Sequence, residues 1–451
     1  MKLSTCVASR ILTPFVASLT LLSLIPTELP AAEPTELSVA EPTELFQRRF
    51  IVNDDGEVLL PKAGGSWDAY LGERFADTRS TQVTTYFLNV GATDRGPGIV
   101  DSLQSTMAYW ADGKEAPERY DVATRKYIEA AHDAGIEIFA SIRINDIHDA
   151  VLPGAAQLTY PLKAAHPEFL LGSEESLRVG RSAYPPKSIM SWFWSGLDWG
   201  QEEVRQHFFD FISMYCEKYA FDGLELDFAR HPLFFRLGEE TENRRVMTEF
   251  VERVRNALTE IGTARGDSYL LAVRVPDSPT FAGHAGLDVE RWLSEGYVDL
   301  LIVGAGYMPY SSRAKEFIDL AHSHSVPAYP CLNHFRGPVQ MHSIASNFWA
   351  LGGDGFYLFN YAGVTGREIN PGYGVSHAIS LDRVGDPERL RWLDKVFAPD
   401  SGSAVPYIGH TNARGQLPVQ LVDGTPVELV IGDDLDFASK ARRVKTMRLE
   451  V

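Results

Sequence analysis

Short apolar runs alternate with longer amphipathic stretches from Phe50 onward. Eight of the runs are typical of β-strands and cover residues 49–53, 83–90, 137–144, 223–227, 269–275, 298–303, 327–332 and 355–360. Helical patterns lie between and after them, near 67–78, 122–134, 201–219, 242–263, 288–296, 313–324, 339–351 and 386–397. Such alternation indicates a parallel sheet of the α/β class, and eight units over roughly 350 residues predict a closed (β/α)8 (TIM) barrel.

Two segments depart from this repeat. Residues 149–200 form a long insertion after the third strand, which we expect to lie over the carboxyl ends of the strands. A break rich in Pro, Ser and Gly at 398–406 separates the barrel, 48–398, from a tail at 405–451. Apolar runs at 417–422, 427–431 and 444–451 predict that this tail is a small β-rich appendage.

The N-terminus has the features of an export signal. Lys2 and Arg10 precede an apolar run at 11–25, and small residues at 31–32 offer a cleavage position, which predicts a signal peptide at 1–32. The run is short for a membrane span, which needs about 20 apolar residues, so we expect no stable membrane insertion after cleavage. Residues 33–47 repeat Ala-Glu-Pro-Thr-Glu-Leu and are expected to be a spacer. The expected location is therefore periplasmic or extracellular.

Charge and cysteine content narrow the function classes. The formal net charge is −18, which disfavours nucleic acid as a partner because phosphates would be repelled. After removal of the signal only Cys216 and Cys331 remain, and we expect two buried free thiols rather than a disulfide framework.

Carboxylates gather on the fourth predicted strand, Gly223–Asp227. Alternate residues of a barrel strand face inward, so Glu225 and Asp227 share the interior side while Leu224 and Leu226 face the helices. Asp227 comes last, at the carboxyl end where barrel active sites lie. We therefore predict Asp227 as a catalytic carboxylate, with its partner open among Glu225, Asp146 and Asp277. Asp222 has the opposite parity and is expected to cap the strand entry.

Polar residues also follow the other strands, and the third strand ends in the densest group, which runs from Arg143 to Asp149. Arg143 is expected either to keep Asp227 ionised or to donate hydrogen bonds to a substrate oxygen. The residues predicted to bind substrate are Arg143, Asn145, His148, Arg230, His231, Arg274, Tyr307, Asn333, His334, Asn360, Tyr361 and Trp194. Asp146, His148 and Asp227 carry metal-binding groups, but their spacing matches no strong metal signature, so no metal or other cofactor is assigned.

Aromatic residues are concentrated in the insertion. Trp192, Trp194 and Trp199 lie there beside Phe193. Flat rings of this kind either stack on the apolar faces of sugars or pack the insertion onto the barrel, and the sequence leaves both roles open.

The stretch from Leu197 to Asp227 resembles the glycosyl-hydrolase-like family 10 barrels. Glu202-Glu-Val-Arg205 is similar to that family's Pro-Glu-Val-Arg-like helix start, and Tyr219-Ala-Phe-Asp-Gly-Leu-Glu-Leu-Asp227 is similar to its Tyr-x-x-Asp-Gly strand motif. The resemblance implies a (β/α)8 fold, a role on polysaccharides, and Asp227 as the acidic strand end. The same strand looks like the Asp-x-x-Asp-x-Asp-x-Glu motif of family 18 chitinases. Ala229 stands where those enzymes have their general acid, which disfavours their mechanism.

Three functions are compatible with these features. The first is an exported glycoside hydrolase that uses Asp227 with a second carboxylate. The second is a barrel that binds carbohydrate without cleaving it, and the third is a metal-assisted hydrolase on the same fold.

Overall fold

The computed structural model contains a closed barrel of eight parallel strands in sequence order. The structure describes residues 49–54, 65–75, 78, 81–97, 102–151, 159–173, 193–304, 313–333, 338–359, 383–398, 427 and 429–448. The strands are β1 (Arg49–Asp54), β2 (Thr85–Gly91), β3 (Glu137–Arg143), β4 (Gly223–Asp227), β5 (Leu270–Val275), β6 (Leu300–Val303), β7 (Ala328–Asn333) and β8 (Gly355–Phe359). All eight coincide with predicted strands, so the (β/α)8 prediction is confirmed.

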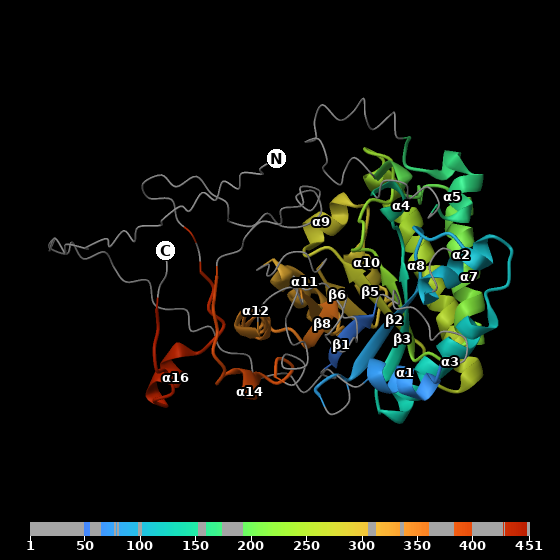
Figure 1. Ribbon diagram of the computed structural model, residues 1–451. Coiled ribbons are helices and arrows are strands. Elements are labelled where there is room, and N and C mark those ends of the chain that lie inside the picture. Colours follow the sequence, from blue (N-terminus) through green and yellow to red (C-terminus); the bar gives the residue numbers. More distant parts are fainter. Residues whose placement is uncertain are drawn as a thin grey trace, which may run out of the picture. The chain divides into compact units, whose positions relative to one another are not determined.

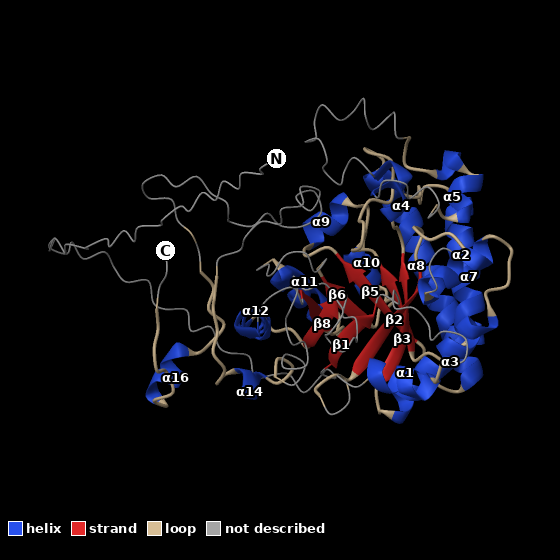
Figure 2. Ribbon diagram, in the orientation of Figure 1, coloured by secondary structure: helices blue, strands red, loops and turns tan. Residues whose placement is uncertain are grey.

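Helices surround the strands (Figures 1 and 2). The main ones are α1 (Trp67–Arg74), α3 (Glu118–Asp133), α7 (Glu202–Lys218), α8 (Glu240–Arg265), α10 (Val289–Ser294), α11 (Ala314–Ser323) and α12 (Pro338–Ala350). α7 illustrates the packing: its buried residues Val204, Phe208 and Phe211 recur at helical spacing and face the sheet. None of the described helices is long and apolar enough to span a membrane.

Short helices fill the connections at the carboxyl ends of the strands. The apolar pattern did not predict α2 (Thr106–Ala111), α4 (His148–Val151), α5 (Pro161–Ala165) or α9 (Pro279–His284). A helix of one or two turns has too few residues to show a helical period. The described parts of the 149–200 insertion, 149–151, 159–173 and 193–200, include α5 and an isolated bridge between Leu170 and Leu197.

The barrel interior is filled with side chains. Ile51, Phe87, Phe139, Tyr329 and Tyr357 are among the buried residues of its central cluster. The ring of Phe139 occupies the space beside Gly223, where an added Cβ would lie 2.1 Å from a ring carbon. At the amino end of the barrel, Arg49 forms a two-point ion pair with Glu137, at 2.8 and 3.1 Å, and donates to Tyr329 Oη at 3.0 Å.

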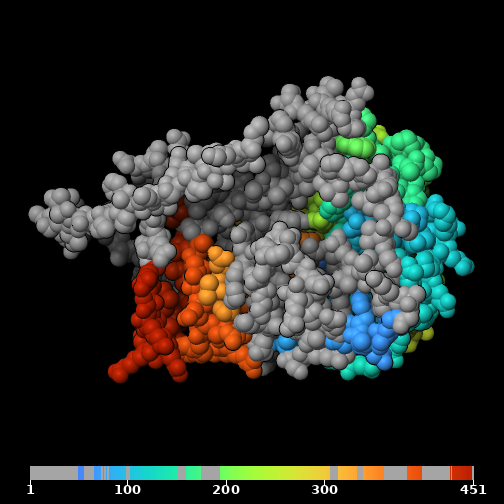
Figure 3. All heavy atoms as spheres, in the orientation of Figure 1, coloured from blue at the N-terminus to red at the C-terminus, as the bar shows by residue number. Residues whose placement is uncertain are grey.

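The C-terminal segment differs from its prediction. No strand occurs in residue 427 or 429–448, so the runs at 427–431 and 444–451 are not strands over their described residues. Instead, Asp434 accepts from the Phe437 amide at 2.8 Å and caps α16 (Leu435–Lys440). The Gly432 amide donates to the side chain of Asn347 in α12 at 2.7 Å, so a helix side chain, rather than a neighbouring strand, holds this backbone. Figure 3 shows this segment in red.

The last predicted helix, 386–397, is also shorter than expected. It ends after one turn as α14 (Pro387–Leu390). The Leu390 carbonyl accepts from the Leu393 amide, three residues on, at 3.1 Å and from the side-chain amine of Lys395 at 2.6 Å, so the chain leaves the α-helical pattern here. The two described cysteines, Cys216 and Cys331, are free and buried, as expected.

Candidate active site at the mouth of the barrel

The two acidic residues of β4 face the barrel interior, as parity predicted. Glu225 is fully buried, and its Oε2 accepts from Ser141 of β3 at 2.5 Å and from Tyr357 of β8 at 3.2 Å. Burial, with the charge of Asp227 adding to it, raises the pKa of Glu225 to about 8. Glu225 is therefore a mostly protonated acid enclosed below the mouth. Asp222, at the other end of the strand, accepts from the Ile138 amide at 2.7 Å and caps the entry as expected.

Asp227 is held in a buried ion pair with Arg274. Its oxygens accept from Nε and Nη2 of Arg274 at 3.0 and 2.6 Å, because the register of β4 and β5 places the two residues side by side. Oδ1 also accepts from the amides of Ala229 and Arg230, at 2.9 and 3.1 Å. Arg274 in turn lies over the ring of Phe359, 4.1 Å from its centre. These contacts fix Asp227 at the base of the mouth with 3% of its surface exposed.

A second polar cluster forms where β3 and β4 end. Arg143 donates from Nη1 to Oδ2 of Asp146 at 3.0 Å, and Oδ1 of Asp146 lies 2.5 Å from Nδ1 of His148. Nη2 of Arg230 lies 2.7 Å from Nε2 of His148. Asp146 is fully buried, whereas the His148 side chain is 26% exposed and that of Arg230 is 12% exposed. His148 and Arg230 therefore connect a buried carboxylate to the mouth.

The protonation of His148 follows from its contacts. Burial lowers the pKa of His148, but the charge of Asp146 more than reverses this and raises it to about 9. A ring with this pKa carries a proton on both nitrogens at neutral pH. Arg230 donates a hydrogen bond to Nε2 only when the ring is neutral, because a guanidinium can only donate; in that form Nδ1 carries the ring proton and points it at Asp146.

Asp94 belongs to this cluster and was missed by the sequence analysis. It follows β2, is fully buried, and places Oδ2 at 2.8 Å from Nδ1 of His148. The signal was present, since Thr93, Asp94 and Arg95 are polar residues directly after a strand end.

His231 closes the cluster from the loop after β4. Its Nδ1 lies 3.3 Å from Oδ1 of Asp146, and its ring packs edge-on against that of His148 with 5.2 Å between centres. Burial lowers the pKa of His231 to about 4 although Asp146 opposes the shift, so the ring is neutral. The structure thus brings together five predicted residues, Arg143, Asp146, His148, Arg230 and His231.

Asn145 tethers the insertion to the barrel. Its side chain accepts from the Leu197 amide at 3.0 Å and donates to the carbonyls of Leu197 and Leu233 at 3.2 and 2.8 Å. Trp199 is fully buried against Phe208 and Phe250, which is the packing role left open above. Trp194 is half-buried and follows Phe193, whose ring packs against His231.

The remaining residues predicted from the sequence are not found at the site within the described part of the chain. Asp277 is buried just beyond β5. Tyr307, His334, Asn360, Tyr361 and Trp192 lie outside the described residues, as do the side chain of Asn333, the predicted signal peptide and the spacer. The substrate contacts predicted for these residues stay predictions.

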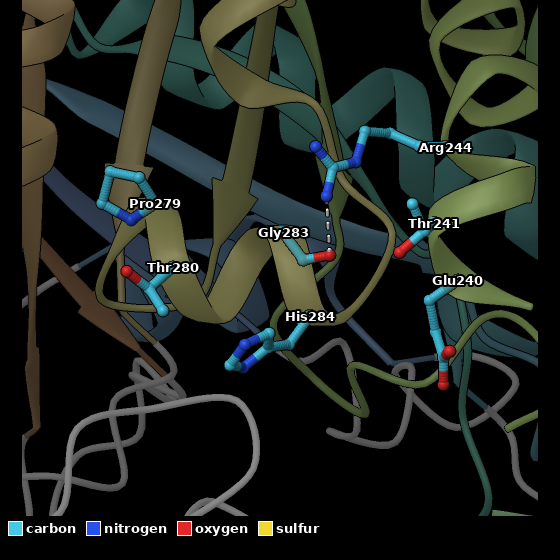
Figure 4. Close-up of a pocket in the computed structure, with 7 residues that line it drawn as sticks. All are labelled: Glu240, Thr241, Arg244, Pro279, Thr280, Gly283 and His284. Carbon is cyan, nitrogen blue, oxygen red and sulfur yellow. Dashed lines mark hydrogen bonds between the residues drawn. The ribbon is translucent and has the colours of Figure 1, made fainter. Parts of the chain in front are cut away.

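A surface cavity of about 460 Å³ lies between the start of α8 and α9 (Figure 4). Its lining residues are Glu240, Thr241, Arg244, Pro279, Thr280, Gly283 and His284, and Arg244 crosses it to donate to the Gly283 carbonyl at 3.2 Å. None of the residues selected from the sequence lines this cavity, so the candidate site is the cluster at the mouth.

Comparison with known proteins gave solved structures only. No protein-family model matches the chain, and no curated protein matches it. An α-galactosidase from Thermus thermophilus in complex with stachyose is 16% identical, with a TM-score of 0.40 over 75% of this chain and 65% of the other. A maltogenic α-amylase from Thermotoga neapolitana is 14% identical, with a TM-score of 0.39 over 76% of each chain.

A family 18 N-acetylglucosaminidase from Paenibacillus barengoltzii is 12% identical, with a TM-score of 0.33 over 63% of this chain and 68% of the other. The chain covers 65% of the α-galactosidase from Thermus thermophilus, which is just under two thirds of that enzyme's length. At these identities and TM-scores the similarities assign neither an activity nor a substrate to this chain.

Proposed function

We propose that this protein is a carbohydrate-active hydrolase that holds its substrate against His148 and Arg230 at the mouth of the barrel. The observation that carries the proposal is the position of these two side chains. They are the partly exposed members of a cluster in which Asp94 and Asp146 are fully buried. An arginine and a histidine give a sugar several donors at a site where barrel enzymes act. The resemblance of Leu197–Asp227 to glycosyl-hydrolase-like barrels and the half-buried Trp194 support a sugar as substrate.

The reaction we propose is hydrolysis of an O-glycosidic bond, in an exported protein of the periplasm or the extracellular space. Asp227 and Glu225 are poor candidates for the reacting pair. The first accepts four hydrogen bonds from Arg274 and two amides, and the second is enclosed below the mouth. We therefore assign the reacting group to the cluster around Asp146, whose partly exposed member His148 connects the buried carboxylate to the mouth, and give Asp227 the role of fixing the end of β4.

Activity of variants on a panel of oligosaccharides tests this proposal. We expect the wild-type protein to release reducing ends from one class of glycan, and Asp146→Asn to lower kcat/KM by about 100-fold or more. Asp133→Asn, on the exposed face of α3, is the matched control and is expected to leave kcat/KM unchanged. Full activity of Asp146→Asn would contradict the assignment of the reacting group.

The second candidate is a barrel that binds carbohydrate without cleaving it. The complete engagement of Asp227 by Arg274 favours it, because the acidic strand motif then supplies no free carboxylate. Wild-type protein that binds a glycan by calorimetry and cleaves none of the panel would decide for this function.

A further inference from the structure

Three side chains at the ends of β3 and β4 bring donor atoms together, namely Asp146, His148 and His231, and Asp94 after β2 contacts one of them, His148. Nδ1 of His148 lies 2.8 Å from Oδ2 of Asp94 and 2.5 Å from Oδ1 of Asp146. Nδ1 of His231 lies 3.3 Å from that same Asp146 oxygen. Donor atoms of Asp146, His148 and His231 all lie within 4.8 Å of one another. Two histidine nitrogens and one carboxylate oxygen thus converge, and an oxygen of Asp94 lies against one of the histidines.

One oxygen of each of the two carboxylates, Asp146 and Asp94, pairs with an arginine. Oδ2 of Asp146 accepts from Arg143 at 3.0 Å, and Oδ1 of Asp94 lies 3.6 Å from Nε of Arg95. Each carboxylate therefore turns one oxygen to an arginine and the other to Nδ1 of His148. Partners on the far side of a ligand are what orient metal-binding side chains in proteins.

Several buried polar atoms of Asp94 and His231 lack a hydrogen bond of good geometry. Within the described part of the chain, both oxygens of Asp94 and Nδ1 of His231 have ion-pair contacts, to His148, Arg95 and Asp146, but none of these contacts has hydrogen-bond geometry. Asp94 is fully buried and His231 is 2% exposed. Leaving buried polar atoms of this kind without hydrogen bonds is costly, so their position beside Asp146 and His148 calls for a ligand.

We propose that these four residues bind one divalent cation and that the donor set selects Zn²⁺. Two imidazole nitrogens and two carboxylate oxygens suit tetrahedral Zn²⁺, whose bonds of about 2.0–2.2 Å hold the ligand atoms about 3.3 Å apart. Asp146 and His231 already have this separation, and the shorter contacts at His148 need to open by less than about 1 Å. The inference concerns metal binding and stands apart from the nature of the substrate.

Arg230 has to move when the metal binds. Nη2 of Arg230 lies 2.7 Å from Nε2 of His148, and in the neutral ring it donates to Nε2 while Nδ1 holds the ring proton. Coordination through Nδ1 requires the single ring proton to move, by exchange with solvent, from Nδ1 to Nε2, where it repels the guanidinium. Arg230→Gln removes this opposition and offers an amide oxygen to Nε2–H. We expect this variant to bind Zn²⁺ about tenfold more tightly than wild type, the size of effect typical of partners of metal ligands.

Equilibrium dialysis of the full chain against Zn²⁺, after treatment with a chelator, tests the proposal. We expect one Zn²⁺ per chain, and a loss of affinity of at least about tenfold in Asp94→Asn and in His231→Gln. Asp94→Asn preserves side-chain shape and guards against a His231 variant that fails to fold. His132→Gln is the matched control, because His132 pairs with Asp222 on the exposed surface at the opposite end of the barrel.

The outcomes separate this inference from the proposed function. Wild-type protein that retains no Zn²⁺, or variants that retain as much as wild type, would overturn the metal site. Hydrolysis of sugars by zinc-free protein would leave the proposed function standing without it. Stoichiometric Zn²⁺ in a protein that cleaves no glycan would establish the site and overturn the hydrolase.

Discussion

Replacing Glu225 with glutamine should change how stability depends on pH. Glu225 is fully buried, and burial together with the charge of Asp227 raises its pKa to about 8, from 4.5 for a free glutamic acid. The folded protein therefore keeps this proton at pH values where the unfolded chain releases it. Stability from this group is fully present below pH 4.5, falls as pH rises from there, and is lost once pH passes about 8.

The size of this loss follows from the shift. One pKa unit corresponds to about 1.4 kcal/mol, so a shift of roughly 3.5 units amounts to about 5 kcal/mol between the two ends of the range. Small domains have unfolding free energies of about 5–15 kcal/mol, so one buried acid would remove a large part of the total. Glutamine keeps the shape of Glu225 and does not ionise, so it removes this slope.

Urea unfolding followed by circular dichroism at pH 5, 6, 7 and 8 measures the effect. We expect the free energy of unfolding of wild type, relative to Glu225→Gln, to fall by about 1.4 kcal/mol per pH unit over this range. Glu217→Gln, an exposed residue on α7, is the control and should follow the wild-type curve. Parallel curves for wild type and Glu225→Gln would show that Glu225 is ionised in the folded protein and would refute the reasoning.

Three further changes test the packing that positions the site, each by urea unfolding. Arg274→Met leaves the buried Asp227 charge without its main partner and should lower the free energy of unfolding by about 3–5 kcal/mol. Gly223→Ala drives a methyl group into the ring of Phe139, and overpacking of this kind should lower it by about 1–3 kcal/mol. Asn145→Ala removes three hydrogen bonds to the insertion and the loop after β4, and should lower the free energy of unfolding by about 1–3 kcal/mol. It should also increase amide hydrogen exchange in residues 193–200. Unchanged exchange there would contradict the role of Asn145 as a tether.

The fold followed from local patterns, which is why the sequence predicted it well. Each strand carried its own short apolar run, and the alternation of inward and outward side chains along β4 placed Glu225 and Asp227 inside the barrel. The described part of the tail departs from its prediction for the same reason, since a β-like run such as 427–431 forms a strand only where another strand lies beside it; the run at 417–422 lies outside the described residues. In the structure its neighbour is a side chain of α12.

The site was predicted in part, because its contacts depend on which strands are adjacent and in what register. Arg274 was selected, but its pairing with Asp227 required knowing that β5 lies next to β4 with these residues aligned. Asp94 joins His148 only because β2 and β3 are neighbours. Asn145 was selected for a substrate role, whereas its three bonds to Leu197 and Leu233 could not be read from spacing along the chain.

The packed interior of the barrel determines how molecules can reach and leave the mouth. Aromatic rings such as Phe87, Phe139 and Tyr357 fill the waist, and the Arg49–Glu137 pair closes the amino end. Along the axis of the barrel that the described strands form, no route is therefore open. Any molecule that reaches the mouth must enter and leave by the same opening, so a long polymer has to lie across it and the product must depart before the next segment can occupy the same position.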